Sequence, residues 1–123
     1  MMFRRKPGTT PEHFREYYET RHAPLATRLL PYFASYTRKF VRHDLSYRPG
    51  GLGGEVNFDV VTELTFENRE DYDRMVQALA DPAVHEQLVR DEEQFMDRSP
   101  GSRLHFFADE EFTPLSTLRG ARA

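Results

Sequence analysis

The chain has 123 residues, which suits one domain with a hydrophobic core and leaves no room for a second. Its 17 basic and 20 acidic residues give a formal net charge of −3, which argues against a nucleic-acid partner, because such proteins carry a basic surplus. It contains no cysteine, no apolar run of transmembrane length and no signal-peptide pattern, so we expect a cytoplasmic protein without disulfides, thiolate metal sites or a membrane partner.

The first part of the chain predicts a short strand and a helix. Residues 2–5 form the candidate strand, which ends at a turn signal over residues 6–8. Thr10 can then serve as an N-cap with Pro11 at the first helical position, and aromatic residues follow at helical spacing. The pattern predicts a helix from Pro11 to about His22.

Two long strands follow. Pro24 disfavours helical geometry at the residue before it, so we expect the first helix to end there, with one or two further helical turns over residues 25–30. Alternating side chains predict one strand over residues 32–43 and another over residues 56–66. Between these strands, residues 49–54 (Pro-Gly-Gly-Leu-Gly-Gly) form either a mobile flap or a plain hairpin loop.

The second half of the chain predicts two helices and a final strand. One helix begins at Asn68, and Asp81-Pro82 opens another by the cap-then-proline pattern. Alternation returns over residues 103–110 and predicts the last strand. No periodic pattern follows it.

The order of these elements is β-α-β-β-α-β, which predicts an α+β, ferredoxin-like fold with a four-stranded antiparallel sheet. We expect a single domain over residues 1–123, with its core in residues 3–110 and a C-terminal tail at 111–123. The helices cover one face of the sheet, and little but the tail remains to cover the other. A second copy of the chain would cover it, so we expect a homodimer that closes an α+β barrel.

The chain resembles the EthD domain family in three stretches near its N-terminus. These are Arg5-Lys6-Pro7-Gly8, Thr10-Pro11-Glu12-His13-Phe14-Arg15-Glu16-Tyr17-Tyr18 and Arg21-His22-Ala23-Pro24-Leu25-Ala26. The likeness continues in residues 59–66 and in Asp91-Glu92-Glu93-Gln94-Phe95, and it spans the chain from Arg5 to Phe107. The first strand is short for this family, so either the start codon is misplaced or the strand is abbreviated.

The resemblance implies membership of the dimeric α+β-barrel superfamily. The family includes proteins encoded beside ether-degrading oxidative systems and fungal enzymes that dehydrate or decarboxylate aromatic polyketides. The wider superfamily includes lactone isomerases, cofactor-free monooxygenases and haem-handling enzymes. The fold therefore does not by itself select the reaction.

His22 is the first candidate catalytic residue, because the predicted helix places it at a C-terminal end with Tyr18 one turn earlier on the same face. A histidine there could protonate a leaving hydroxyl group or remove a proton from an activated carbon, with Tyr18 as its orienting or proton-donating catalytic neighbour. The resemblance implies that this His-Ala-Pro segment lines the pocket. The alternative is that His22 only caps the helix by binding backbone carbonyls.

Asp59 and Glu63 are the candidate catalytic carboxylates, since both project from one face of a predicted strand with Val61 between them. If that face lines the barrel, burial would favour the protonated form of such a group and suit it to acid or base catalysis. The alternative is a carboxylate that is exposed to solvent or paired with Arg38 or Arg103.

Four further residues are candidates for substrate contact. Phe14 and Tyr36 supply aromatic surface for a small apolar or aromatic molecule. Val61 lies between the two carboxylates, and His105 projects from the last strand, where it could share a face with Glu63.

These residues predict an enzyme that needs no cofactor. No close-spaced ligand pair suggests a metal, and the glycines at 50–54 open no helix, as a nucleotide-binding motif requires. The first hypothesis is a lyase or isomerase that dehydrates or decarboxylates a small aromatic or polyketide-like hydroxy-carbonyl compound. The alternatives are a non-catalytic ligand-binding accessory protein of a degradation pathway and a cofactor-free oxygenase that oxidises an electron-rich phenol.

Overall fold

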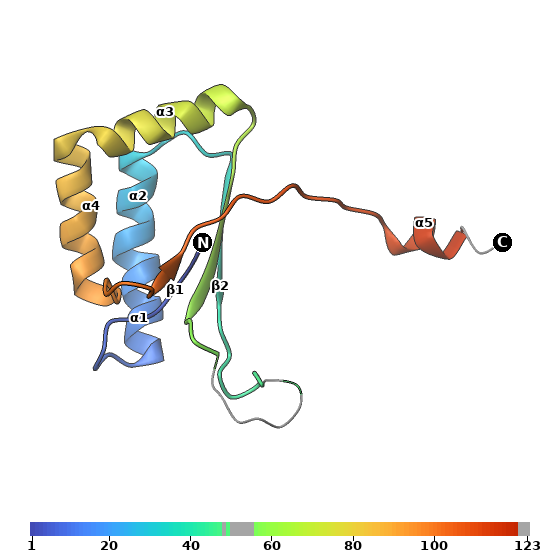
Figure 1. Cartoon of the computed structure of the whole chain (residues 1–123), viewed down its shortest axis with the longest axis horizontal. Coiled ribbons are helices and arrows are strands. Elements are labelled where there is room, and N and C mark those ends of the chain that lie inside the picture. The colour runs from blue at the N-terminus through green and yellow to red at the C-terminus, as the bar shows by residue number, and fades with distance from the viewer. Residues whose placement is uncertain (48, 50–55, 121–123) are drawn as a thin grey trace.

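The computed structural model describes residues 1–47, 49 and 56–120, in which helices pack on one face of a sheet (Figure 1). The strands are β1 (Met2–Phe3), β2 (Ser35–Phe40), β3 (Val60–Thr65) and β4 (Arg103–Leu104). The helices are α1 (Pro11–Tyr17), the π-helical turn η1 (Tyr18–His22), α2 (Ala23–Leu29), α3 (Arg69–Ala80), α4 (Pro82–Phe95) and α5 (Leu115–Gly120). None of the helices in the described ranges has the length and apolar character needed to span a membrane. The predicted loop at 49–54 lies, apart from Pro49, outside the described residues.

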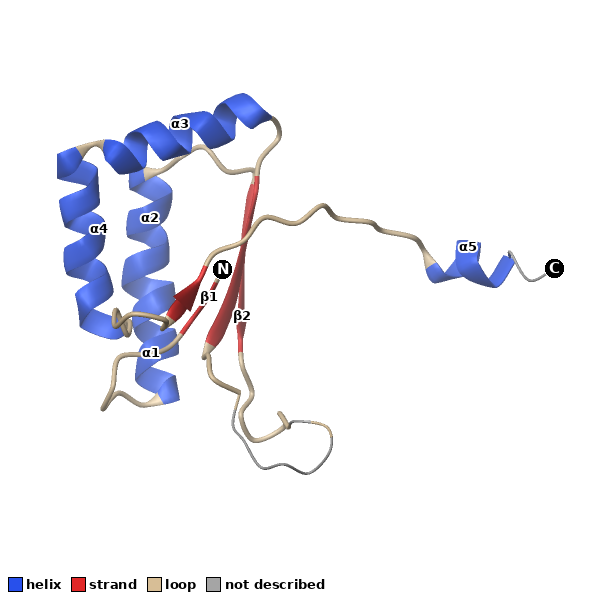
Figure 2. Cartoon of the chain, viewed as in Figure 1, coloured by secondary structure: helices blue, strands red, loops and turns tan. Residues whose placement is uncertain are grey.

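The four strands form one antiparallel sheet in the order β2-β3-β1-β4 (Figure 2). β2 and β3 pair along their whole length, from Ser35 opposite Thr65 to Phe40 opposite Val60. β1 lies between β3 and β4 and makes two residue pairs with each. This arrangement confirms the predicted α+β, ferredoxin-like fold with a four-stranded antiparallel sheet.

Short polar side chains begin three of the helices, as the sequence predicts. Thr10 Oγ1 accepts a hydrogen bond from the backbone N–H of His13 at 3.1 Å, and Asn68 caps α3 in the same way. Asp81 accepts from the N–H of Ala83 at 2.8 Å, with a proline at the start of α4. Local side-chain chemistry therefore sets where these helices begin.

The prediction that the first helix ends at His22 is wrong, because α1, η1 and α2 form one uninterrupted helical run over residues 11–29. Pro24 has no N–H, and its ring would clash with a carbonyl of the preceding turn in a regular α-helix. The π-helical turn is wider by one residue, and in it the N–H of Ala23 bonds to the carbonyl of Tyr18. The wider turn accommodates the proline, so His22 lies inside the run instead of at its end.

The strands are shorter than the alternating pattern predicts. β2 and β3 have six residues each, fewer than the predicted ranges 32–43 and 56–66. β4 ends at Leu104 and not at residue 110, because its neighbour β1 offers only two residues for pairing. Beyond β4 the chain forms an extended segment that leads to α5, and we call residues 105–120 the C-terminal arm. The arm leaves the sheet on the side away from the other helices (Figure 1).

An aromatic cluster forms the centre of the hydrophobic core. It consists of Phe3 from β1, Phe14 and Tyr18 from the first helical run, and Phe95 from α4, each at most 1% exposed. The ring centroids lie between 5.5 and 6.2 Å apart. Aromatic pairs of this kind contribute about 0.5–1.5 kcal/mol beyond the burial of their surface. The cluster therefore packs the first helical run and α4 against the sheet.

Phe95→Ala should lower the free energy of unfolding by about 3–5 kcal/mol, because it leaves a cavity at the centre of this cluster. Urea denaturation followed by circular dichroism measures the change. Tyr47→Ala is the control, since Tyr47 is 80% exposed and its truncation should change the free energy by less than about 0.5 kcal/mol. Equal losses in the two variants would contradict the role assigned to the cluster.

Candidate functional site

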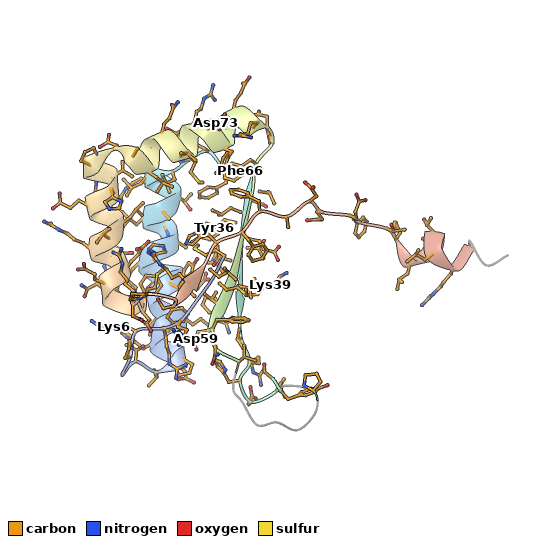
Figure 3. The ribbon with its side chains drawn as sticks, viewed as in Figure 1. Lys6, Tyr36, Lys39, Asp59, Phe66 and Asp73 are labelled. Atoms are coloured by element: carbon orange, nitrogen blue, oxygen red, sulfur yellow. The ribbon has the colours of Figure 1, made fainter. Side chains whose placement is uncertain are left out.

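A cavity of about 310 Å³ lies between the helical layer and the sheet, and we call it the central cavity. Its volume falls at the lower end of the range of ligand pockets, about 300–1,000 Å³. The apolar part of its wall includes Ala26, Leu30, Phe33, Leu64, Met75 and Leu79. Figure 3 shows Tyr36 and Phe66 on this side of the sheet, whereas Lys39 lies on the other side.

Polar side chains reach the same cavity from several elements. They are His22 from η1, Tyr36 from β2, Thr62 from β3, Glu92 from α4, Arg103 from β4 and His105 from the start of the arm. Three of these residues, His22, Tyr36 and His105, are among those that the sequence predicts for a site. The structure brings the three together around one volume.

His22 is held by a carboxylate from the facing helix. The residue is only 7% exposed, and its Nδ1 lies 2.8 Å from Oδ2 of Asp91 on α4. An ionised carboxylate only accepts hydrogen bonds, so Nδ1 carries a proton in this arrangement. Nε2 is then the ring nitrogen left for a molecule in the cavity, and no hydrogen bond reaches it within the described part of the chain.

The Asp91 carboxylate is itself fixed in place. Its second oxygen, Oδ1, accepts a hydrogen bond from the hydroxyl group of Tyr17 at 2.8 Å. Burial and the adjacent Asp91 raise the pKa of Tyr17 to about 12, so this hydroxyl group stays protonated and donates at neutral pH. The rings of Tyr17 and His22 both lie against Phe95, at centroid distances of 5.2 and 4.9 Å. Asp91 and His22 are therefore held in one orientation.

Tyr18 contacts His22 through its ring and not through its hydroxyl group. The two ring centroids are 5.4 Å apart in an edge-to-face arrangement. The Tyr18 hydroxyl group lies 2.8 Å from Thr62 Oγ1 and 2.8 Å from the hydroxyl group of Tyr36. Burial raises the pKa of Tyr18, which therefore stays protonated in this chain of hydroxyl groups.

Tyr36 is the end of that chain at the cavity. Burial, followed by the neighbouring Tyr18, raises its pKa, so its hydroxyl group is also protonated at neutral pH. If Tyr18 donates its proton to the Tyr36 oxygen, the Tyr36 O–H remains free to donate into the cavity. The Arg38 guanidinium lies 4.7 Å from the centre of the Tyr36 ring and is paired with Glu19, not with a cavity carboxylate.

Asp59 lies outside the central cavity, although it is buried. Its Oδ2 accepts from the backbone N–H of Arg5 at 2.8 Å, and its Oδ1 lies 2.5 Å from Arg5 Nη1 and 2.9 Å from His43 Nε2. It borders a separate hollow of about 160 Å³ whose wall includes Phe14. The arrangement ties the loop after β1 to the loop after β2. Asp59 is not brought together with His22.

Glu63 lies on the face of the sheet away from the helices. It is exposed there and forms an ion pair with Lys39 at 2.9 Å. Val61 shares this face and is half-buried. Of the residues predicted to contact a substrate, Phe14 and Val61 thus lie away from the central cavity, while Tyr36 and His105 line it. The two candidate carboxylates, Asp59 and Glu63, therefore do not share the cavity with His22, because they lie at the end of the sheet and on its opposite face.

A second acidic residue of α4 holds a cation at the cavity. Glu92 Oε2 accepts from Arg103 Nη1 at 3.2 Å, and Arg98 Nη1 lies 3.5 Å from the same oxygen. His105 lies close enough to Arg103 to be affected by its charge. Burial, together with the positive charge of Arg103, lowers the pKa of His105 and favours its neutral form.

Sequence reasoning missed Asp91, Glu92 and Arg103 as site residues. Asp91 and Glu92 belong to a stretch that resembles the EthD family, which was the available signal. For Arg103 the sequence predicts only an ion pair with Asp59 or Glu63. Within the described residues, no group of three or more histidine or acidic side chains is arranged to hold a metal ion.

A family model confirms the resemblance. The model describes the EthD domain and matches residues 6–99. This range contains His22, Tyr36 and Asp91 and ends before Arg103 and His105. The match covers more than half of the 123 residues. The chain therefore belongs to the EthD domain family.

Proposed function

We propose that the protein is a cofactor-independent lyase or isomerase that acts on a small aromatic or polyketide-like hydroxy-carbonyl compound in the central cavity. The observation that carries this proposal is the pairing of a buried His22 with Asp91 at the wall of a largely apolar cavity. Such a pair leaves one ring nitrogen as a proton acceptor. Removal of a proton next to a carbonyl group requires an acceptor of this kind.

In the proposed reaction His22 Nε2 removes a proton from the carbon between the carbonyl group and the hydroxyl-bearing carbon. The C–H electron pair forms an enolate, and Tyr36 donates a hydrogen bond to the enolate oxygen. Asp91 stabilises the imidazolium without taking its proton. In a dehydration the carbonyl re-forms and expels the hydroxyl group, which takes the proton from His22 and leaves as water. In an isomerisation the proton returns to a different carbon.

We propose further that the enzyme works as a homodimer. No described helix covers the second face of the sheet, and the C-terminal arm leaves on that side (Figure 1). The arm carries Phe107 and Phe112, each 79% exposed, and Leu115, which is 63% exposed. A second copy packed against this face would remove these side chains from water.

His22 should carry its proton on Nδ1 when its ring is neutral, because Asp91 accepts from that nitrogen. The ¹⁵N shifts of the ring in two-bond ¹H–¹⁵N correlation spectra distinguish the two tautomers. Asp91→Ala should shift the ring toward the Nε2–H form, whereas Glu93→Ala, at the next exposed acid of α4, should not. A parent protein with its proton on Nε2 would remove the basis of the proposed mechanism.

His22→Gln should reduce turnover by about 10²–10⁴-fold, since glutamine keeps a hydrogen-bonding group but cannot accept and return a proton. The probe is 3-hydroxy-1-phenylbutan-1-one, whose dehydration gives a conjugated enone with a new ultraviolet absorption. Exchange of its α-protons in D₂O, followed by NMR, reports the first step separately. His85→Gln, at an exposed position of α4, is the matched control and should behave like the parent.

The accessory-protein alternative predicts a different outcome for the same variants. Binding of the probe would then be measurable, but neither enone formation nor proton exchange would depend on His22. A His22→Gln protein that folds, binds and turns over like the parent would end the acid–base assignment.

Light scattering should give twice the mass of one chain at micromolar concentration. Deletion of residues 109–123 should weaken the affinity of dimerisation by about tenfold or more, because it removes the exposed apolar side chains Phe112 and Leu115 from the proposed interface. A parent protein that is monomeric at this concentration would disprove the dimer. A deletion variant that dimerises as tightly as the parent would show that the arm is not part of the interface.

A further inference from the structure

We infer that the substrate of the central cavity carries a carboxylate group, and that Arg103, with His105 beside it, binds this group. The inference rests on the proposed function, since it names the substrate class of the same site. Its evidence is separate, however, and comes from the charges at the end of the cavity where β4 and the arm form the wall.

The charged groups at this end of the cavity do not balance. Among the described residues that line the cavity, Glu92 is the only carboxylate. It is shared between two guanidinium groups, those of Arg103 at 3.2 Å and Arg98 at 3.5 Å. Glu92 therefore carries one negative charge against two guanidinium groups, of which Arg103 lines the cavity. Met1 also lines the cavity, and its α-ammonium group, which donates to the carbonyl of Thr62 at 2.8 Å, adds positive charge close enough to His105 to lower its pKa. The charges at this end of a largely apolar cavity are thus positive in surplus. An organic anion is the ligand that such a surplus attracts.

Arg103 retains hydrogen-bonding capacity for a ligand. Its side-chain contacts within the described chain are made by Nη1, to Glu92 Oε2 at 3.2 Å and to Met96 Sδ at 3.8 Å. Nε and Nη2 make none there. A guanidinium group presents its N–H donors in a planar fork that matches the two oxygens of a carboxylate. The side chain is 30% exposed, which leaves it accessible from the cavity.

His105 suits the same anion. Partial burial and the charge of Arg103 lower its pKa, which favours the neutral form and so reduces repulsion between the imidazole and the guanidinium. Its ring N–H can donate to a carboxylate oxygen. Leu30, Phe33 and Met75 supply apolar surface for the rest of such a molecule.

The positions of His22 and Arg103 constrain the reaction. Asp91 and Glu92 are neighbours on α4, and they hold His22 and Arg103, respectively, at the wall of one cavity. The bound carboxylate and the carbon that loses its proton are therefore different parts of the substrate. A guanidinium that binds the carboxylate stabilises the charged ground state, which opposes its loss as CO₂. This favours dehydration or isomerisation over decarboxylation.

Binding of 1-naphthoate and 1-naphthamide tests the inference, since the two probes share a ring system and differ in charge. The chain has no tryptophan, so the fluorescence of the naphthalene ring can be followed against tyrosine alone. The parent protein should bind 1-naphthoate about 10- to 100-fold more tightly than 1-naphthamide. This comparison needs no variant and is therefore independent of any effect on folding.

Arg103→Gln should abolish the preference for 1-naphthoate and leave the affinity for 1-naphthamide unchanged. Arg90→Gln is the matched control, because Arg90 is an exposed guanidinium of α4 that pairs with Glu86 and does not line the cavity, and it should keep the preference. Arg103→Lys, which keeps the charge without the planar fork, should retain part of it.

Equal affinity of the parent for both probes, a preference that survives in Arg103→Gln, or no binding of either probe up to about 1 mM would overturn the inference. The outcomes are distinguishable from those for the proposed function. If turnover depends on His22 but the protein shows no preference for the anionic probe, the proposed lyase or isomerase function is kept and the carboxylate site is ruled out. A preference for the anion without such turnover would define a binding protein for aromatic carboxylates.

Discussion

The hydrogen bond from the N–H of Ala23 to the carbonyl of Tyr18 determines where the functional side chains of this protein lie. It closes a helical turn that is wider than usual and lets the helix continue past Pro24. Tyr18 and His22 consequently face the core together, with their rings in contact. A helix that ended before the proline would leave His22 at an open end, where a carboxylate of α4 could not reach it.

Two consecutive acidic residues on α4 then organise the cavity. Asp91 orients His22, and Glu92 holds Arg103. Each contact joins a different part of the chain to the same helix, so the positions of His22 and Arg103 depend on how α4 packs. Partly buried pairs of this kind are costly to break on one side, because the remaining charge is left without a partner. The aromatic cluster around Phe95 supplies the packing that keeps α4 in place.

The sequence predicts those parts of the fold that depend on local chemistry. Thr10, Asn68 and Asp81 cap helices as expected, because each needs only the N–H groups of the next turn. The βαββαβ order follows from the periods of the segments. Strand lengths do not follow, since alternation continues over residues 105–110, with which no strand in the described part of the chain pairs.

The candidate site is only partly predictable for a related reason. His22 stands out because it lies two residues before a proline and one helical turn after Tyr18. Asp91, in contrast, lies 69 residues away along the chain, and only the packing of α4 against η1 brings it to His22. Alternation along β3 puts Val61 and Glu63 on one face of the sheet, but it does not show which face borders the cavity. Asp59 is buried as a carboxylate of interest would be, yet Arg5 and His43 occupy its oxygens.

The strands of the sheet are joined by unequal numbers of residue pairs, and this difference affects where a molecule can enter the cavity. β2 and β3 share six residue pairs, whereas β4 is attached to β1 by two. Local opening costs least where the fewest backbone hydrogen bonds must break. The segment that carries Arg103 and His105 is therefore the wall that separates most readily from the rest, and its displacement leaves the β2–β3 hairpin intact. Under the proposed binding of a carboxylate by Arg103, a molecule can enter beside that side chain through the part of the fold that is easiest to move.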